Sequence, residues 1–326
     1  MSVTLLWRTD VHLSDQTPKS RKDVWSDTVL AKLAYVGKLA GSVGADAVLD
    51  GGDFFDIKSP TRNSHSLVRR AIQTHAEYPC EVYANVGNHD CVYGDIDYLH
   101  QQPLGVLFEC GVFNRLYNEH EAVFVKDGVK VRVVGIPYRG TTYDMNWFSN
   151  ITRGDEDYLI VVAHLLASKT ATTMFESEDI VKYEYLDAFP VDAYFFGHWH
   201  KDQGIHKTAK GKYVVNIGSL TRGSLSEDDL ERVPSVAIVR CDRDGMRIER
   251  VPVEHAAGTA VFDVVAKQME EVREEVMSEF ADLVRRELLV PVAKVSLKDK
   301  IRGLSSIPDS VRERMLLYVE KAEGVK

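Results

Sequence analysis

The sequence predicts a mixed α/β fold of the α+β kind, in which two β-sheets pack face to face as a sandwich with helices outside and a helical segment at the C-terminus. Three observations favour this fold. Residues 3–86 alternate strand-like apolar runs with helical periodicity, the pattern of parallel α/β units. The middle of the chain is a series of further strand-like runs, the later ones joined by short polar turns. Helical periodicity returns after residue 258.

The N-terminal part contains three predicted strands and two predicted helices. The strands are the short apolar runs at residues 3–9, 47–49 and 82–86. One helix begins near Ser26 and the other covers about 64–76, because apolar residues recur in both segments at three- and four-residue steps. Strand and helix therefore alternate along this part of the chain.

The middle of the chain contributes six more predicted strands. The turn sequence Asp242-Arg243-Asp244-Gly245 is the clearest of the short polar connections, and it predicts hairpin pairing among the later strands. The six runs are residues 131–136, 158–163, 193–196, 213–217, 235–239 and 246–253.

The composition changes after Gly258, where we predict the boundary between a domain of residues 1–258 and a helical segment of residues 259–326. A single apolar stripe from about 263 to 289 predicts a long helix that ends before Pro291. A second helix is predicted after Pro308. The stripe consists of Val265, Met269, Val272, Val276, Phe280 and Leu283.

Composition limits the classes of function. The chain has 326 residues and a formal net charge of −9, which argues against a protein that coats nucleic acid through bulk charge but is compatible with a local basic groove. No stretch approaches the roughly 18 apolar residues of a membrane span, and the N-terminus carries no export leader. The sequence therefore predicts a soluble, cytoplasmic protein. Its four cysteines fit no zinc-finger spacing and are interpreted as mostly buried thiols in a reducing compartment.

Polar residues able to bind metal follow five of the strand-like runs. Strand ends are where an α/β sheet displays functional groups, because the sheet fixes the backbone while the loops stay accessible. Each motif alone is common in loops, but their joint occurrence predicts one site. The five are Asp10-Val11-His12, Gly52-Asp53, Gly87-Asn88-His89-Asp90, Ala163-His164 and Gly197-His198-Trp199-His200.

Phosphoester hydrolysis would use such a set of residues. The negative phosphate repels hydroxide, and two metal ions about 3.5–4 Å apart can neutralise it, activate water and stabilise the leaving oxygen. Two ions need a carboxylate that bridges them together with further oxygen or nitrogen ligands. The motifs supply carboxylates, an amide and imidazoles without an ordered set of cysteines, which points to manganese, iron or catalytic zinc.

In this order, the motifs resemble the calcineurin-like metallophosphoesterase superfamily over residues 3 to about 254. The resemblance implies that Asp53 bridges two divalent metal ions, that His89 handles the leaving oxygen, and that Asp90 supports the site by orienting His89. The remaining ligands would be Asp10, His12 and His200 for the first ion and Asn88, His164 and His198 for the second.

Within the superfamily, the segment Gly52-Asp53-Phe54-Phe55-Asp56-Ile57 lacks the arginine of the protein serine/threonine phosphatases. It resembles instead the SbcD-type nucleases of DNA double-strand-break repair. Residues 218–227, Gly-Ser-Leu-Thr-Arg-Gly-Ser-Leu-Ser-Glu, resemble a second signature of that branch. A histidine often seen in relatives is replaced by Asp56, which leaves the role of this residue open.

The SbcD resemblance implies a manganese-dependent exonuclease and endonuclease that acts on DNA in repair and recombination. It also implies a homodimer bound to an SbcC-type coiled-coil ATPase through C-terminal helices, for which we favour residues 296–322. The predicted helix at 263–289 would serve equally as a cap on its own domain. A small phage-encoded member, working in the host cytoplasm, is one plausible source.

Five basic residues are candidates for contacts with DNA, and two alternative functions remain open. The sequence is also compatible with a phosphodiesterase for small nucleotides such as cyclic nucleotides, or with a scaffold that recruits an ATPase through its C-terminal helices. The basic candidates are Lys19, Arg21, Lys22, Arg62 and Arg222.

Overall fold

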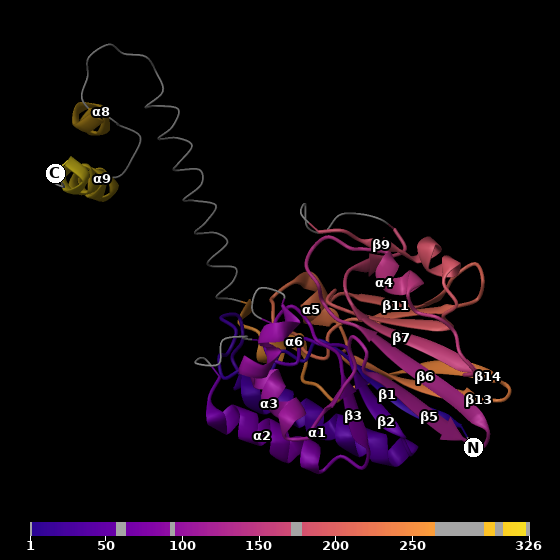
Figure 1. Ribbon diagram of the computed structural model, residues 1–326. Coiled ribbons are helices and arrows are strands. Elements are labelled where there is room, and N and C mark those ends of the chain that lie inside the picture. The colour runs from indigo at the N-terminus through magenta and orange to yellow at the C-terminus, as the bar shows by residue number, and fades with distance from the viewer. Residues whose placement is uncertain are drawn as a thin grey trace. The chain divides into compact units, whose positions relative to one another are not determined.

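The computed structural model describes residues 2–56, 63–91, 95–170, 178–264, 297–303 and 309–323 (Figure 1). The chain divides into two compact units, Met1–Asp263 and Val264–Lys326. The sequence placed the boundary slightly earlier, near 258. Residues beyond 258 belong to the first unit because Phe262 is fully buried there and forms an isolated β-bridge with Arg21.

The first unit contains two large sheets, as predicted. In the first sheet β1 to β4 are parallel, and β13 and β14 add an antiparallel hairpin beside β1. The strand order is β14 (Gly245–Pro252), β13 (Ser235–Asp242), β1 (Val3–Arg8), β2 (Ala47–Asp50), β3 (Glu81–Ala84) and β4 (Asn114–Arg115).

The second sheet also has a parallel centre, formed by β6, β7, β10 and β12, with an antiparallel strand at each edge. Hairpin pairing was predicted for the later strands and holds for β13 with β14 and for β12 with β11, whereas β6, β7, β10 and β12 run parallel to one another. The order is β11 (Asp202–Lys207), β12 (Tyr213–Ile217), β10 (Ala193–Gly197), β7 (Tyr158–His164), β6 (Val129–Ile136) and β5 (Glu121–Lys126).

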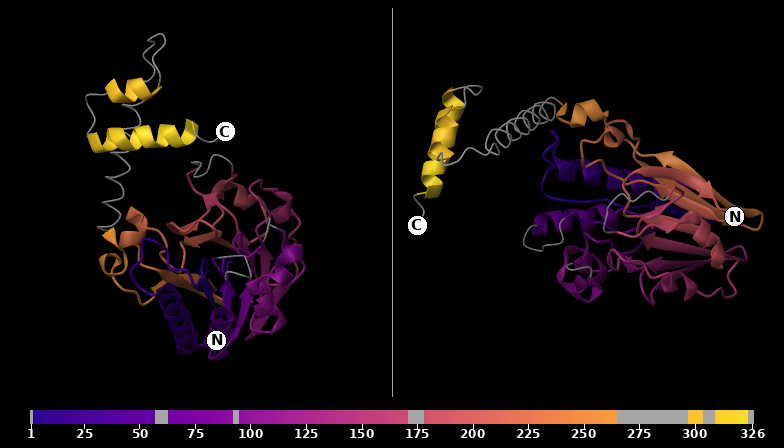
Figure 2. Two further views of the ribbon diagram at one scale, coloured as in Figure 1. Left: turned by 90° about the vertical axis from the view of Figure 1, so that its left-hand side faces the viewer. Right: turned by 90° about the horizontal axis from the view of Figure 1, so that it is seen from above.

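Helical segments cover the outer face of each sheet, which confirms the predicted layers (Figures 1 and 2). The first sheet is covered by α1 (Trp25–Val43), α2 (His65–Ala76) and α3 (Pro103–Glu109). The second is covered by α4 (Asn146–Ser149) and the 3₁₀ helix η4 (Tyr183–Ala188). The unit is completed by η3 (Ile96–Gln101), β8 (Ala167–Ser168), β9 (Val181–Lys182), α5 (Glu227–Glu231) and α6 (Gly258–Val261).

Alternation along the strands explains why the sheets pack as a sandwich. Successive residues of a strand point to opposite faces. Leu5 and Trp7 of β1 therefore face the core between the two sheets, whereas Leu6 packs under the helices. Such a strand is buried on both faces, and this is why the parallel strands read as continuous apolar runs.

Some predicted elements agree closely with the structure and others were missed. The helix predicted at 64–76 is α2, and Ser64 caps it by accepting a hydrogen bond from the Leu67 amide. The strand β11 was missed because its sequence, Asp-Gln-Gly-Ile-His-Lys, has no strand pattern and its pairing with β12 decides its conformation. Of the cysteines, Cys110 is exposed rather than buried.

The C-terminal unit contains α8 (Leu297–Gly303) and α9 (Asp309–Glu323), which pack against each other. The helix predicted after Pro308 is α9. The long helix predicted at 263–289 lies almost wholly outside the described residues. None of the helices in the described parts of the chain is long and apolar enough to span a membrane.

A buried ion pair anchors the strands that carry the first two ligand motifs. The Arg8 guanidinium at the end of β1 lies 2.7 Å from the Asp50 carboxylate at the end of β2, and both side chains are fully buried. The remaining guanidinium nitrogens bond to Tyr78 and His75, and Asp50 accepts from the Gly52 amide. The pair therefore ties β1 and β2 together immediately before their ligand loops.

We expect Asp50→Asn to lower the free energy of unfolding by about 3–5 kcal/mol, because it leaves the Arg8 guanidinium as an uncompensated buried charge. Urea denaturation of the two proteins measures the difference. The exposed pair Asp27–Arg70 is the matched control, and Asp27→Asn should cost at most about 1 kcal/mol. Equal effects of the two substitutions would contradict a structural role for the buried pair.

Candidate metal centre

The five predicted motifs meet at one edge of the sandwich. Asp10 follows β1, Asp53 follows β2 and Asn88 follows β3, all in the first sheet. His164 ends β7 and His198 follows β10, in the second sheet. The carboxyl ends of parallel strands lie at the same edge of a sheet, so two sheets with parallel centres bring these loops together.

The backbone is strained at this edge. Asp10, His12, Asp53 and His198 all adopt positive φ angles, of 52°, 50°, 53° and 87°. Such conformations cost of order 1–3 kcal/mol each for residues other than glycine and cluster at functional sites. Four predicted ligands share this strain, which indicates that the fold holds them in place for binding.

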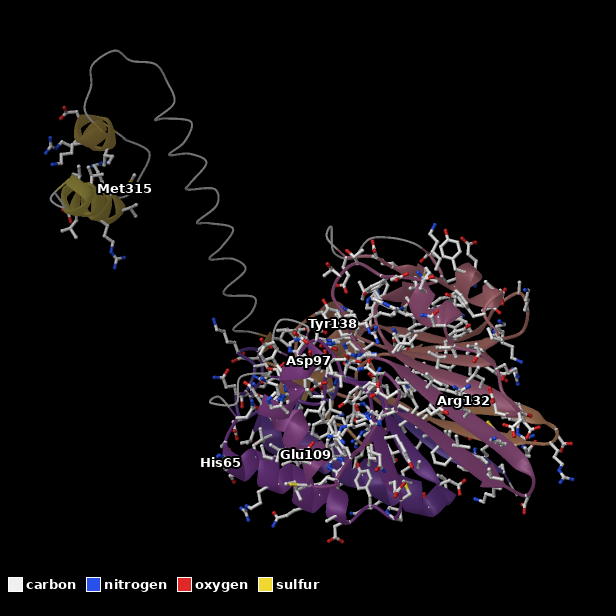
Figure 3. All side chains as sticks on the ribbon, in the orientation of Figure 1. His65, Asp97, Glu109, Arg132, Tyr138 and Met315 are labelled. Atoms are coloured by element: carbon white, nitrogen blue, oxygen red, sulfur yellow. The ribbon has the colours of Figure 1, made fainter. Side chains whose placement is uncertain are left out.

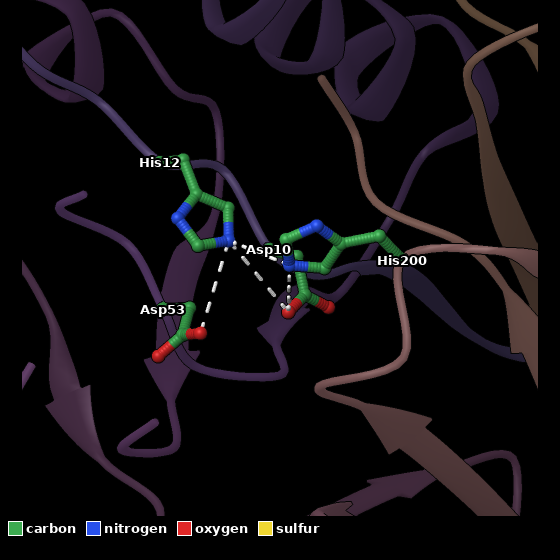
Figure 4. Close-up of side chains that lie close together, drawn as sticks. All are labelled: Asp10, His12, Asp53 and His200. Carbon is green, nitrogen blue, oxygen red and sulfur yellow. Dashed lines mark hydrogen bonds and ion pairs between the residues drawn. The ribbon is translucent and has the colours of Figure 1, made fainter. Parts of the chain in front are cut away.

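The first group of ligands consists of Asp10, His12, Asp53 and His200 (Figure 4). The two Nε2 atoms of His12 and His200 are 2.9 Å apart. Oδ1 of Asp10 lies 3.6 Å from Nε2 of His200 and 4.0 Å from Nε2 of His12. The imidazole nitrogens and carboxylate oxygens therefore converge on a common point.

The second group consists of Asp53, His164 and His198. Nε2 of His164 lies 3.4 Å from Oδ2 of Asp53 and 3.2 Å from Oδ1 of Asn88. The same Asp53 oxygen is 3.8 Å from Nε2 of His12 in the first group. Asp53 thus lies between the two groups, as a carboxylate that bridges two ions must.

Outer hydrogen bonds fix the orientation of the histidine rings. His164 donates from Nδ1 to the Gly51 carbonyl at 2.9 Å, which leaves its Nε2 lone pair toward Asp53. His12 bonds through Nδ1 to Asp56 at 3.2 Å, so its Nε2 also points inward. Histidines that bind metals usually donate the other ring N–H to a carbonyl or a carboxylate in this way.

The electrostatics match a cation-binding site. Burial alone would lower the pKa of His164, but the adjacent carboxylate of Asp53 raises it to about 9. Burial would also lower the pKa of His12, but the hydrogen bond to Asp56 and the charges of Asp53 and Asp10 raise it to about 9. In return, the charges of the histidines hold the pKa of Asp53 well below its usual range despite its burial. Metal binding here would release protons from both rings.

The donor set fits two divalent ions. Carboxylate oxygens, an amide oxygen and imidazole nitrogens suit manganese, iron or zinc, and the bridging carboxylate joins the two groups. Two glycines make this close approach possible. A Cβ at Gly87 would lie 2.0 Å from Oδ1 of Asp53, and a Cβ at Gly52 (φ 100°) would lie 2.6 Å from the Gly87 amide nitrogen.

His89 lies beside the two ligand groups. Its backbone amide donates to Oδ1 of Asp53 at 2.7 Å, and its Nδ1 donates to the Asp56 carbonyl at 2.6 Å. The side chain is 40% exposed. The ring is thereby anchored on one nitrogen while its body stays accessible, the arrangement that a proton donor to substrate needs.

Asp90 contacts the backbone of the Asp53 loop, whereas the sequence predicted that it orients His89. Its carboxylate accepts from the amides of Asp53 and Gly87, at 2.7 and 2.9 Å, and from those of Phe54 and Phe55. Burial and the Asp53 charge raise the pKa of Asp90, and the hydrogen bonds from the Gly87 and Phe55 amides oppose the rise. Asp90 therefore holds the bridging ligand, and the Asp56 carbonyl orients His89.

Three residues that the sequence did not assign also contact the centre. Asp56 bonds to His12 as described above. Glu178 accepts from Nε2 of His198 at 3.0 Å. Tyr138 follows β6 (Figure 3), and its ring centroid lies 5.4 Å from that of His198. Glu178 and Tyr138 belong to no recognisable motif, so only the tertiary structure identifies them.

The five basic candidates have different locations. Lys19 lines a cavity beside His12, His89 and His200. Lys22 is exposed and bonds to the Thr259 carbonyl. Arg62 lies outside the described residues.

Arg21 and Arg222 line neither of the two cavities that contain His89 and His200, and both are bonded to the protein itself. Arg21 is buried, pairs with Asp23 and donates to the Arg222 carbonyl. Arg222 is buried and donates to the carbonyls of Asp229, Arg232 and Ala256. Both residues hold loops together.

Two cavities meet at the centre, of about 400 and 470 Å³. His89 and His200 line both of them, and so does Ser224. The segment 218–226 contributes to both walls, with Ser219, Thr221 and Gly223 on one side and Ser226 on the other. This edge of the sandwich is therefore open in two directions from His89.

Comparisons with known proteins identify the family. Residues 5–202 match the family model of the calcineurin-like phosphoesterases. A search of the curated proteins found no match to this sequence. Solved structures similar to this chain include TT1561 of Thermus thermophilus, at 12% identity and a TM-score of 0.47, with 78% of this chain and 100% of that chain covered.

Two further structures show a similar degree of resemblance. One is a dimetal phosphatase from Danio rerio, at 12% identity and a TM-score of 0.48, with 78% of this chain and 100% of that chain covered. The other is the NAD nucleotidase of Haemophilus influenzae, at 15% identity and a TM-score of 0.44, with 78% of this chain and 56% of that chain covered. Each TM-score is below 0.5, so the assignment rests on the family model, which covers more than half of the sequence. The chain belongs to the calcineurin-like phosphoesterase family.

Proposed function

We propose that this chain is a two-metal phosphodiesterase of SbcD type that cleaves DNA as an exonuclease and endonuclease. The observation that supports it best is the pair of cavities that meet at His89 and His200. A phosphodiester in a polymer continues on both sides of the scissile phosphate, and the two cavities offer room on both sides. The segment that resembles the second SbcD signature lines both.

The chain's own residues would act on the leaving group and on the strand. The two ligand groups that share Asp53 would hold two divalent ions, which we propose to be manganese and which would supply neutralisation of the phosphate and activation of water. His89 then donates a proton to the departing ester oxygen, because its Nδ1 is held by the Asp56 carbonyl and its ring borders both cavities. Lys19 would contact a neighbouring phosphate of the strand.

We further propose that α8 and α9 bind an SbcC-type coiled-coil ATPase and that the complex contains two copies of this chain. The apolar residues Val311, Met315, Leu316 and Val319 of α9 are each only partly buried, and Leu317 is 52% exposed. Apolar surface of this kind on a short helical pair is typical of a docking surface for another helix. Co-purification of the two proteins, lost on Leu317→Asp, tests this proposal.

Lys19→Ala should weaken DNA cleavage by raising KM several-fold with little change in kcat, because a contact to a phosphate other than the scissile one contributes to binding. Lys22→Ala is the matched control, since Lys22 bonds to the Thr259 carbonyl away from both cavities. Steady-state cleavage of a labelled duplex with Mn²⁺ measures both. An equal effect of the two variants would remove Lys19 from the DNA path.

The nuclease function itself is tested with a small diester as comparison. Purified protein with Mn²⁺ should hydrolyse bis-p-nitrophenyl phosphate and also cleave single-stranded or duplex DNA. Hydrolysis of the small diester without cleavage of any DNA, with or without an ATPase partner, would refute the nuclease function while leaving phosphodiester chemistry intact. Turnover of a cyclic nucleotide in that case would favour the small-nucleotide alternative.

A further inference from the structure

Lys32 is an unusual residue for the core-facing side of α1. Its side chain is only 6% exposed, and its neighbours on the same face include the apolar core residues Val29, Leu33 and Val36. Within the described parts of the chain, its ammonium nitrogen is buried and has no hydrogen-bond partner. Burying an unpaired charge costs free energy, and a counter-charge beside Lys32 would offset that cost.

The surroundings of Lys32 form a cavity of about 540 Å³, which we call the Lys32 pocket. Trp25 lines both this pocket and the cavity beside His12 and Lys19, so the indole separates the two. The Trp25 Nε1 group donates to the His12 carbonyl at 2.9 Å, which fixes the indole in that position. The polar lining of the pocket includes Arg21, Asp23, Thr28, Lys32, Arg222 and Glu254.

Two of the four buried cations around the pocket have no carboxylate partner among the described residues. Arg21 pairs with Asp23 at 2.6 Å. Arg232 pairs with Asp229 at 2.9 Å and Asp228 at 3.3 Å.

The other two cations, Arg222 and Lys32, both line the pocket. Arg222 donates only to backbone carbonyls in this part of the chain, and Lys32 donates to none of the groups described. Glu254 also lines the pocket but is exposed at its rim. Of the three cations that line the pocket, only Arg21 is paired with a carboxylate among the described residues.

We propose that the Lys32 pocket is a binding site for a phosphate group, separate from the metal centre. A phosphate carries close to two negative charges and several acceptor oxygens, which match the ammonium of Lys32 and the guanidinium of Arg222. The carbonyl contacts of Arg222 hold it in place before an anion binds, so little ordering is needed on binding.

The electrostatics of Lys32 support the proposal. Burial lowers the pKa of Lys32 to about 7, and the charges of Arg222, Arg232 and Arg21 act in the same direction, while the charge of Asp23 opposes them. A bound phosphate next to the ammonium would counter these effects and keep the group charged. The site does not depend on the DNA activity proposed above, because it is defined by the pocket alone.

The test is the number of phosphates bound by the full-length, Mn²⁺-loaded protein in equilibrium dialysis with labelled inorganic phosphate. We expect Lys32→Met to lose one equivalent of phosphate, or to bind it about tenfold more weakly or worse, relative to the wild type. Phosphate held at the metal centre is common to both proteins and cancels in the comparison. Lys38→Met, an exposed lysine on the same helix, is the matched control and should lose nothing.

A second readout guards against a merely structural effect. Replacing a buried charge by an apolar side chain should raise the melting temperature of Lys32→Met in the absence of phosphate, while phosphate should stabilise the wild type more than the variant. Lys32→Gln serves the same comparison if the methionine variant does not fold. Equal stoichiometry and affinity for phosphate in the wild type and in the Lys32 variant would overturn the proposal.

The source of the phosphate is distinguished with oligonucleotides. If the pocket receives the terminal phosphate of DNA, a 5′-phosphorylated strand should bind more tightly than the same strand with a 5′-hydroxyl, and Lys32→Met should abolish the difference. If free phosphate is the ligand, the two strands should bind equally while the Lys32-dependent binding of inorganic phosphate persists. Absence of Lys32-dependent binding with all three probes would again refute the site.

Discussion

His89→Gln is expected to reduce phosphodiester hydrolysis by about 10²- to 10⁴-fold while metal binding is unchanged. The imidazole is held through Nδ1 by the Asp56 carbonyl, and it lies beside both ligand groups without belonging to either set of predicted ligands. Glutamine fills a similar volume and can still donate to that carbonyl, but it cannot give a proton to the leaving oxygen. Initial rates of DNA cleavage with Mn²⁺ and a metal titration measure the two properties.

Comparing two substrates with different leaving groups tests the role of His89 in proton transfer more specifically. A leaving group that needs no protonation, such as p-nitrophenolate, should lose less activity than DNA, whose leaving alkoxide is far more basic. His65→Gln is the matched control, because His65 is exposed at the start of α2 (Figure 3). Unchanged DNA cleavage in His89→Gln would remove His89 from proton transfer. Loss of metal together with activity would make it a ligand instead.

Asp53→Asn is expected to abolish the dinuclear centre. Oδ2 of Asp53 lies 3.8 Å from Nε2 of His12 and 3.4 Å from Nε2 of His164, so this carboxylate is the one shared by the two ligand groups. Removing its charge should lower the number of bound ions from two to at most one. The loss of several kcal/mol of charge stabilisation in the transition state corresponds to about 10³-fold or more in rate.

Asp56→Asn provides a graded comparison for Asp53. Its carboxylate bonds to the outer nitrogen, Nδ1, of His12 and should tune the affinity of that ligand by about 10–100-fold without changing the number of ions. Metal analysis after dialysis, with circular dichroism to verify folding, distinguishes the two substitutions. If Asp53→Asn retains two ions and full activity, Asp53 does not bridge.

Local sequence was sufficient to predict most of the fold. Continuous apolar runs predicted the parallel strands, because a strand buried on both faces needs apolar residues on both. The pairing directions were harder. The runs at 158–163 and 193–196 look alike whichever way they pair, and the structure shows that β7 and β10 are parallel. The strand β11 depends on β12 for its existence, and its own residues do not predict it.

The candidate ligands could be predicted because each belongs to a short motif at a strand end, and parallel strands bring such ends to the same edge of a sheet. Residues that act through a ligand were not predictable in the same way. Glu178 reaches His198 from a part of the chain without any motif, and Asp90 turned out to hold the Asp53 loop. Hydrogen-bond partners depend on the packing of distant segments, which spacing in the sequence does not encode.

The positions of basic residues in the sequence were a poorer basis for prediction than the metal-binding motifs. Arg21 and Arg222 were predicted to contact DNA from their positions near motifs, yet both are buried and bonded to the protein itself. The sequence pattern does not distinguish Lys32, because a lysine in an amphipathic helix is normally at the surface. Only the tertiary structure shows that Lys32 is buried and lines the same pocket as Arg222.

The most direct test of the central claim is the number of Mn²⁺ ions bound to the full-length chain, measured by elemental analysis after equilibrium dialysis. A centre in which Asp53 joins the His12 and His164 groups predicts two ions per chain in the wild type and at most one in Asp53→Asn. It also predicts that hydrolysis of a phosphodiester rises in step with occupancy of the second ion. A single ion at saturation, or full activity with one ion bound, would contradict the two-metal centre.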